Sequence, residues 1–182
     1  MCDILKIEEG ITMVKYETIN LIFKPIDIEL AEKVHINFFS QKETAKYLLW
    51  KPTNTPDEAR SRLERWSAEI DGYYFFLIHE KRTLEPIGYI TAQETDKGVY
   101  DNFGICLGQD YVSRGYGTET IVWFLKFLKE KKAKKIKYSY LEGNNASKAL
   151  VLKHGFNYTH MGERVRNYDQ QHFNEYFYEL LI

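Results

Sequence analysis

The chain has 182 residues, of which 44% are hydrophobic and 28% are charged, and its formal net charge is −1. This length and composition suit one soluble α/β domain that buries a core of its own. The near-neutral charge, with no interleaving of basic and aromatic residues, excludes nucleic acid as a main ligand.

Nothing in the chain predicts a linker, a membrane segment or a metal site. Only four prolines and no Gly/Ser-rich stretch occur, and no apolar run approaches the roughly 20 residues of a membrane span. The start, Met1 to Ile4, lacks the basic end and long apolar core of a signal peptide. Cys2 and Cys106 make no disulfide scaffold and suit a reducing cytosol, so a cytoplasmic location is expected. The histidines show no metal-ligand spacing.

The first predicted elements are a strand over 19–24 and a helix that Asp27 caps and that ends near residue 39. Thr55 to Glu58 predicts a second helix, because this segment offers a cap, a proline at the first helical position and a glutamate placed for a capping box. The apolar face of this helix consists of Ala59, Leu63, Trp66 and Ile70.

The rest of the chain alternates strands with two helices. Further strands are expected over 74–79, 87–93, 100–107, 136–140, 156–160 and 173–181. An amphipathic helix between the third and fourth of these is predicted by Ile121, Phe124, Leu125 and Leu128. Mixed strands with helices between them predict an α/β, or α+β, fold.

A glycine loop joins the 100–107 strand to this amphipathic helix. Gly115 and Gly117 stand one residue apart, and a strand–glycine loop–helix arrangement aims backbone N–H groups at an anionic ligand. A Walker A loop is excluded because Thr118 and Glu119 follow where a lysine is needed. A dinucleotide fingerprint is excluded because Thr120 stands at its third glycine. The loop therefore predicts a phosphorylated cofactor of another kind.

A second motif follows one helix and one strand later. Residues 142–147 lead into a short helix that Asn144 or Asn145 can cap. Gly155 supplies the left-handed residue that ends this helix, and Phe156 starts the next strand.

Together the two motifs resemble those of the GNAT (Gcn5-related) N-acetyltransferases. Residues 114–119 are similar to the family's pyrophosphate loop, Gln/Arg-x-x-Gly-x-Gly/Ala, in the form common in the Rim-type branch of ribosomal-protein N-terminal acetyltransferases. Val112 departs from the Gln or Arg of that pattern. Residues 144–156 resemble the family's Asn-x-x-Ser/Ala…Lys-x-Gly-Phe segment, and 21–25 resemble its opening strand. The resemblance covers the chain from about Leu21 to the end.

The resemblance implies one N-acetyltransferase domain over 16–182, preceded by an extension, 1–15, of unknown role. The implied fold is a mixed, mostly antiparallel sheet with helices on both faces, splayed between its fourth and fifth strands. The implied reaction uses acetyl-CoA, with CoA as product, and acetylates a primary amine by direct attack in a ternary complex. The acceptor is a protein N-terminus or a small amine, and the protein is a monomer or a homodimer.

By the same resemblance, the pantetheine arm lies along the fourth strand, where a backbone amide serves the thioester oxygen, and the pyrophosphate lies on the glycine loop. The implied cofactor-binding residues are Ile105, Cys106, Leu107, Ser113, Arg114, Gly115, Tyr116, Gly117, Thr118, Asn144, Ser147 and Lys153. Cys106 itself is expected to be a small apolar residue rather than a nucleophile, because no positioned base accompanies it.

The proton donor for the leaving thiolate is implied to be Ser147. Many family members use a tyrosine four residues before the Gly-Phe pair, and Val151 occupies that position here. In the Rim-type branch a serine takes this role, and it corresponds to Ser147. The alternative is that Ser147 is a first-turn helix residue bonded to backbone.

The general base stays open. The family's usual glutamate position on the fourth strand holds Asn102, which cannot take a proton, and another branch's glutamate position holds Ser139. Two candidate bases are left: Asp101, which faces away from Asn102 unless a bulge intervenes, and Glu142, at the end of the fifth strand. With no strong base, kcat/KM for a high-pKa amine is expected to rise with pH between about 7 and 9.

Two further interpretations remain. Val151 and Asn102 stand at two usual catalytic positions and cannot carry out the chemistry there, so a CoA-binding sensor or partner module without catalysis is the alternative function. The remaining interpretation is an enzyme that transfers a longer acyl group. The acceptor would use the variable segment 39–71 and the C-terminal hairpin.

Overall fold

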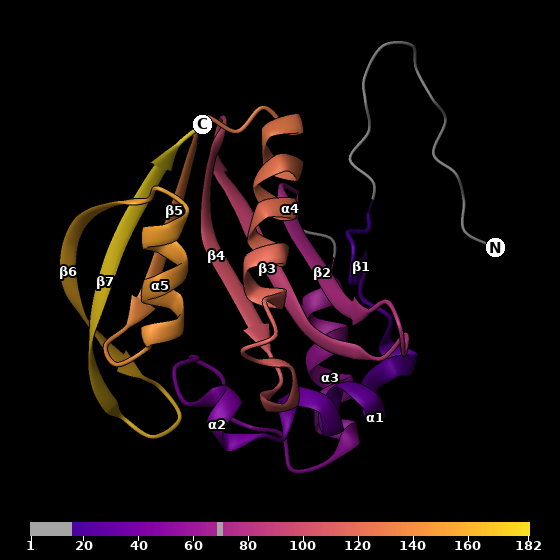
Figure 1. The fold of residues 1–182 in the computed structure, drawn as a ribbon. Helices are drawn as coiled ribbons and strands as arrows, with labels where there is room; N and C mark the ends of the chain where they lie inside the picture. Colours follow the sequence, from indigo (N-terminus) through magenta and orange to yellow (C-terminus); the bar gives the residue numbers. More distant parts are fainter. Residues whose placement is uncertain (1–15, 69–70) are drawn as a thin grey trace, which may run out of the picture.

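The chain folds into one seven-stranded sheet with helices on both faces (Figure 1). The structure is a computed structural model and describes residues 16–68 and 71–182. The predicted extension, 1–15, and Ile70 of the predicted apolar helix face lie outside the described residues. The strands are β1 (Leu21–Lys24), β2 (Tyr73–Glu80), β3 (Pro86–Asp96), β4 (Val99–Leu107), β5 (Lys135–Leu141), β6 (Asn157–Arg166) and β7 (Gln171–Leu181).

The sheet order is β1-β2-β3-β4-β5-β7-β6, and all neighbouring pairs are antiparallel except β4–β5, which is parallel. The mixed, mostly antiparallel fold expected from the sequence is therefore confirmed. The two C-terminal strands are longer than expected, because their hairpin continues to its turn at 167–170.

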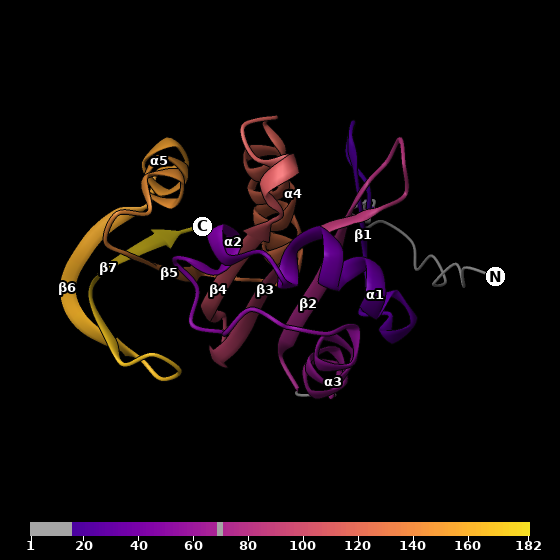
Figure 2. The same ribbon diagram turned by 90° about the horizontal axis from the view of Figure 1, so that it is seen from below.

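Helices cover both faces of the sheet (Figures 1 and 2). The helical segments are η1 (Ile28–Leu30), α1 (Ala31–Val34), the π turn η2 (His35–Phe39), α2 (Lys42–Ala45), α3 (Pro56–Ser67), η3 (Gln109–Tyr111), α4 (Tyr116–Glu130) and α5 (Asn145–Lys153). Of these, α4 and α5 lie on one face, and α1 and α3 lie beneath β2–β4 on the other. None of the helices in the described part of the chain has the length and apolar character that crossing a bilayer requires.

Local capping explains where the early helices begin. The Asp27 carboxylate accepts a hydrogen bond from the Glu29 N–H (3.0 Å), so one helical run of mixed type extends to Phe39 as expected. Thr55 Oγ1 accepts from the Glu58 N–H at 3.2 Å. The predicted capping box is modified, because Glu58 Oε2 accepts from the N–H of Asn54 (2.7 Å), one residue before the cap.

Two hydrophobic clusters hold the layers together. The larger lies between the sheet and α4, and in it Phe23 stacks on Trp123 with ring centroids 3.6 Å apart. The smaller lies between the sheet, α1 and α3, where Leu63 and Phe38 are fully buried against Tyr89. The sheet is therefore fixed from both sides in the region from β1 to β4.

β4 carries one extra residue relative to both of its neighbours. Tyr100 pairs with Ile136 of β5, and the next pair is Phe103 with Tyr138, so three steps along β4 match two along β5. The pairing with β3 is shifted over the same stretch. This β-bulge at 101–102 leaves both Tyr100 and Phe103 buried on the α4 side of the sheet.

Candidate functional site

β4 and β5 separate beyond the bulge, and a cavity opens beside the end of β4. Their last paired residues are Phe103 and Tyr138. The cavity, about 600 Å³ in volume, lies between the end of β4, the start of α4 and the start of α5. Of the residues predicted for the cofactor, it is lined by Ile105, Cys106, Leu107, Ser113, Gly115, Gly117, Thr118, Asn144 and Ser147.

The glycine loop reaches the cavity through two left-handed residues. Ser113 has φ +61° and Gly115 has φ +83°, and α4 begins immediately afterwards. The first N–H groups of a helix have no partner within the helix, and Gly117 and Thr118 present theirs at the cavity wall. The loop therefore offers several backbone donors and a helix N-terminus to one anionic group.

Gly117 has room for one side-chain carbon. A Cβ placed there would lie 3.6 Å from Leu150 Cδ1 and 3.9 Å from Leu107 Cδ1, which is ordinary van der Waals contact. The backbone has φ in the common range, so the glycine is not required by the helix itself. What the missing side chain provides is access from the cavity to the backbone.

Arg114 and Tyr116 turn away from the cavity and contact a buried carboxylate at the end of β2. Tyr116 Oη donates to Glu80 Oε1 (2.8 Å), and Arg114 Nη1 lies 3.6 Å from the same oxygen. The hydrogen bond from Tyr116, together with one from Thr83, lowers the pKa of Glu80. The contacts of Arg114 and Tyr116 with Glu80 hold the loop in place. The groups left to bind a phosphate are the backbone N–H groups of the loop.

α5 brings a serine hydroxyl to the opposite wall. Asn144 Oδ1 accepts from the Ser147 N–H (3.1 Å), which caps the helix and fixes Ser147 in its first turn. The capping role predicted for Asn144 is confirmed, and Gly155 has the left-handed φ of +76° expected after the helix. Val151, at the family's tyrosine position, is fully buried.

A buried tyrosine from β5 stands behind Ser147. Tyr138 Oη donates to Ser147 Oγ at 3.1 Å, and burial raises the pKa of the Tyr138 phenol. The phenol therefore stays protonated and can resupply a proton to the serine. The sequence predicts a strand at Tyr138 but no role for its side chain. Nothing in the sequence indicates that β5 and α5 bring the hydroxyl groups of Tyr138 and Ser147 together.

The other predicted site residues lie elsewhere. Glu142 is exposed, and its carboxylate accepts from Asn174 Nδ2 (3.0 Å) and Tyr176 Oη (3.4 Å) on β7. Lys153 is exposed in the last turn of α5, outside the cavity. Asn102 lies in the bulge, and its side chain is outside the described part of the structure.

The segment around α2 closes the cavity, and the C-terminal hairpin holds that segment. Tyr47 packs against Gly143, where a Cβ would lie 3.2 Å from Tyr47 Oη. The buried Arg166 of β6 donates from Nη1 to the carbonyl oxygen of Lys46 (2.7 Å), and it pairs with Asp169 at 2.7 Å. The two regions expected to meet the acceptor are thus joined directly.

Cys106 contributes backbone to the cavity while its side chain packs against Phe38 and Tyr89 in the smaller cluster. Burial raises the pKa of the thiol well above its ordinary value, so thiolate is absent near neutrality. The expectation of a small apolar residue is confirmed.

We expect the native protein, with Cys2 replaced by serine, to resist Ellman's reagent at pH 8 and to release one equivalent of chromophore after unfolding in guanidinium. The unfolded sample is the control for a reactive thiol. Rapid labelling of the folded protein would show that Cys106 is accessible.

The splayed sheet and the donors at its mouth define a protein that binds an extended, phosphorylated cofactor. The acetyltransferase (GNAT) domain model matches residues 20–157, and the chain therefore belongs to the GNAT acetyltransferase family. GNAT acetyltransferases use acetyl-CoA, so the chain is an acetyl-CoA-dependent N-acetyltransferase, as predicted.

Solved structures share the fold at low sequence identity. A GNAT-family acetyltransferase from Bacillus anthracis has 20% identity and a TM-score of 0.76, covering 91% of this chain and 96% of that chain. The microcin C7 self-immunity acetyltransferase MccE, in complex with acetyl-CoA and AMP, has 16% identity and a TM-score of 0.79, covering 91% and 94%. RimL, a ribosomal L7/L12 alpha-N-protein acetyltransferase in complex with coenzyme A, has 13% identity and a TM-score of 0.77, covering 91% and 96%. No curated protein sequence matches the chain.

Proposed function

We propose that this acetyltransferase acts on a primary amine, either a protein N-terminus or a small amine, by direct attack in a ternary complex, and that it belongs to the Rim-type branch. The loop 114–119 and the serine at 147 support the branch. One observation carries the reaction: the cavity has backbone donors for an anion at one wall and the Ser147–Tyr138 hydroxyl pair at the other.

The residues present fit acetyl-CoA. Gly117 leaves the α4 N-terminus open to a pyrophosphate, and β4 beyond Phe103 has no β5 partner, so the backbone of 105–107 can bond a pantetheine arm. Acetyl-CoA supplies the activated thioester. The chain aligns the reactants, and alignment alone contributes about 7–11 kcal/mol of effective-concentration advantage.

The hydroxyl pair supplies the proton that the departing sulfur needs. Ser147 Oγ gives its proton into the cavity as Tyr138 Oη gives its proton to Ser147. The raised pKa of Tyr138 keeps this donor loaded across the neutral range. Ser147 thus combines the helix-capping contact of its backbone with a chemical role for its side chain.

A cytoplasmic location and a monomeric or dimeric state belong to the same proposal. The location is inferred from Cys106, since a buried free thiol persists best in a reducing compartment. No membrane or nucleic-acid partner is proposed.

A thiol-release screen tests the function. We expect free CoA thiol to appear when the protein is given acetyl-CoA and members of a panel of peptide N-termini and small primary amines. Calorimetry with acetyl-CoA runs beside it. Binding without thiol release from any amine would instead identify a CoA-binding module that lacks catalysis, and faster release from longer acyl-CoA donors would revise the acyl group.

A further inference from the structure

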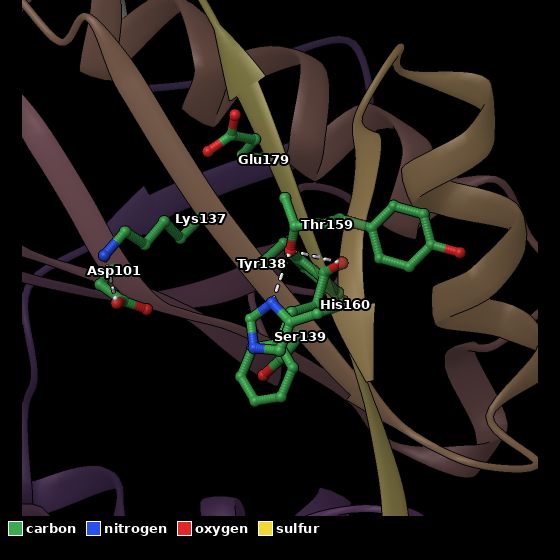
Figure 3. A pocket seen from close by; sticks show the side chains of 9 residues that line it. Asp101, Lys137, Tyr138, Ser139, Thr159, His160 and Glu179 are labelled. Carbon is green, nitrogen blue, oxygen red and sulfur yellow. Dashed lines mark hydrogen bonds and ion pairs between the residues drawn. The ribbon is translucent and has the colours of Figure 1, made fainter. Parts of the chain in front are cut away.

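The face of the sheet opposite α5 carries a second hollow, over β5, β7 and β6 (Figure 3). Its volume is about 390 Å³, enough for a small-molecule headgroup and a short body. The residues used below are Asp101, Lys137, Ser139, Thr159, His160 and Phe177, all of which line it. No helix of the described chain lies over this part of that face (Figure 2).

Ser139 lies where this hollow meets the separation of β4 and β5. It follows directly after Tyr138, which forms the last pair with Phe103. Tyr138 Oη bonds Ser147 of α5, and strand alternation places the Ser139 side chain on the face of the hollow. The two hydroxyl groups therefore stand on opposite faces of one strand, beside the point where β4 and β5 separate.

The Ser139 proton is committed to a buried carboxylate. Ser139 Oγ donates to Glu175 Oε1 on β7 at 2.7 Å, and Glu175 is only 5% exposed. Arg164 Nε donates to the other carboxylate oxygen, also at 2.7 Å, which compensates the buried charge. Because its hydrogen points to Glu175, Ser139 presents acceptor lone pairs to the hollow.

An aromatic pair forms the far wall. His160 of β6 stacks on Phe177 of β7 with ring centroids 4.4 Å apart and planes 2° from parallel. Gly162 leaves room for the Phe177 ring, because a Cβ there would lie 3.2 Å from Phe177 Cε2. The hollow thus combines a hydrogen-bond acceptor at one end with a flat, largely apolar wall.

We propose that this hollow receives the primary ammonium group of the acceptor, with Ser139 as its contact and Glu175, acting through Ser139, as the group that takes its proton. The inference rests on the proposed function and assigns the base that the sequence left open. A free alkylamine and the first residue of a peptide present the same headgroup.

The proton balance is complete. The ammonium passes one proton to Ser139 as Ser139 passes its own proton to Glu175. Glu175 then releases the proton that it received to water. The freed nitrogen lone pair forms the C–N bond, and the C–S bond breaks with its electrons on sulfur. The nitrogen then loses a second proton to water, and a proton from water returns through Ser147 to Tyr138 in place of the one that sulfur gained. An ammonium and acetyl-CoA become an amide, CoA thiol and one released proton.

Other charged groups face the hollow and are largely paired. Asp101 of β4 lies 3.5 Å from Lys137 of β5, and Glu179 of β7 lies 3.1 Å from Lys135. The bulge turns Asp101 toward this face, the side of Lys137. His160 of β6 bonds Thr159 Oγ1 at 3.0 Å. The carboxylate of Glu175 is distinct from these groups in being both buried and joined to Ser139.

The pH profile of kcat/KM for 2-phenylethylamine tests the proposal. This amine is almost entirely protonated below pH 9, so the wild type, which binds the ammonium, should have a level profile from pH 7 to 9. Ser139→Ala and Glu175→Gln should accept only the neutral amine. Their kcat/KM should be about 100-fold below wild type at pH 7 and rise about tenfold per pH unit.

Matched variants separate this role from a structural one. Ser139→Thr keeps the hydroxyl and should restore the level profile. Asp169→Asn breaks another carboxylate–arginine pair in the same hairpin and should keep the wild-type shape. A wild-type profile that rises with unit slope, or variants with wild-type profiles, would overturn the proposal while leaving acetyl transfer intact. A wild-type kcat/KM that rises with pH is the result expected from the sequence, in which Asn102 leaves no strong base.

A binding measurement makes the inference independent of turnover. With CoA present, 2-phenylethylamine should shift the backbone NMR signals of Ser139 and Phe177, and 2-phenylethanol, which lacks the ammonium, should not. Ser139→Ala should weaken the amine at least tenfold. Unshifted signals would overturn the hollow as the acceptor site even in an active enzyme. Comparison of 2-phenylethylamine with phenylalanyl-glycinamide as acceptors then distinguishes a free amine from a peptide source.

Discussion

Replacing Ser147 with alanine is expected to lower kcat about 100-fold and to leave the KM for acetyl-CoA nearly unchanged. A proton donor acts in the transition state, where general acid catalysis typically contributes 10²–10⁴-fold, and adds little to ground-state binding. Steady-state kinetics with the best amine from the screen, and single-turnover assays to isolate chemistry, would measure the change.

Tyr138→Phe should reproduce most of this loss, because it removes the hydroxyl that resupplies Ser147. Tyr140→Phe is the matched control: it removes a buried hydroxyl from the same strand face, where the partner is Tyr178 at 3.3 Å and not Ser147. An unchanged chemical step in Ser147→Ala would reduce the serine to its helix-capping contact. Equal losses in both tyrosine variants would point to packing.

The second large effect is expected for Gly117→Val, which should weaken acetyl-CoA binding at least tenfold, or about 1.4 kcal/mol. The first side-chain carbon fits between Leu150 and Leu107, but a branched side chain would extend into the cavity and block the backbone donors. Isothermal titration calorimetry of the folded variant would measure the loss.

Lys126→Val controls for a branched residue in α4, since this exposed position lies outside the cavity. Its affinity for acetyl-CoA should match wild type. If Gly117→Val folds and binds with wild-type affinity, the pyrophosphate does not lie on this loop.

The sequence predicted the elements whose physical causes are local. The glycine loop, the cap at Asn144 and the helix start at Thr55 depend on residues within a few positions of one another, and each was found where expected. The mixed, mostly antiparallel sheet and its splay followed from the family resemblance. α2 was missed, because its single turn at Lys42–Ala45 has neither a side-chain cap nor a full apolar face.

The side chains that complete the site could not be read from the chain, because long-range pairing brings them together. Glu175 lies 36 positions from Ser139, and Tyr138 faces Ser147 only because α5 folds back over β5. Ser139, at a position that holds a glutamate in another family branch, bonds Glu175 from another strand, whereas Val151, at the family's tyrosine position, is buried in the larger cluster. The sequence indicated which functions were missing, but not which strands would supply them.

The bulge in β4 determines which atoms the cofactor meets. A strand has a parity, since each residue faces the side opposite to its neighbour, and one extra residue inverts that parity for everything downstream. With the insertion, Ile105 faces α4 and Cys106 faces α3. Regular alternation through 101–102, without the bulge, would exchange those two faces and place the thiol in the cavity. Length changes in the hairpin turns would leave both this parity and the bulge intact, so the protein should tolerate them. A deletion at 101–102 would instead remove the bulge at which β4 leaves β5.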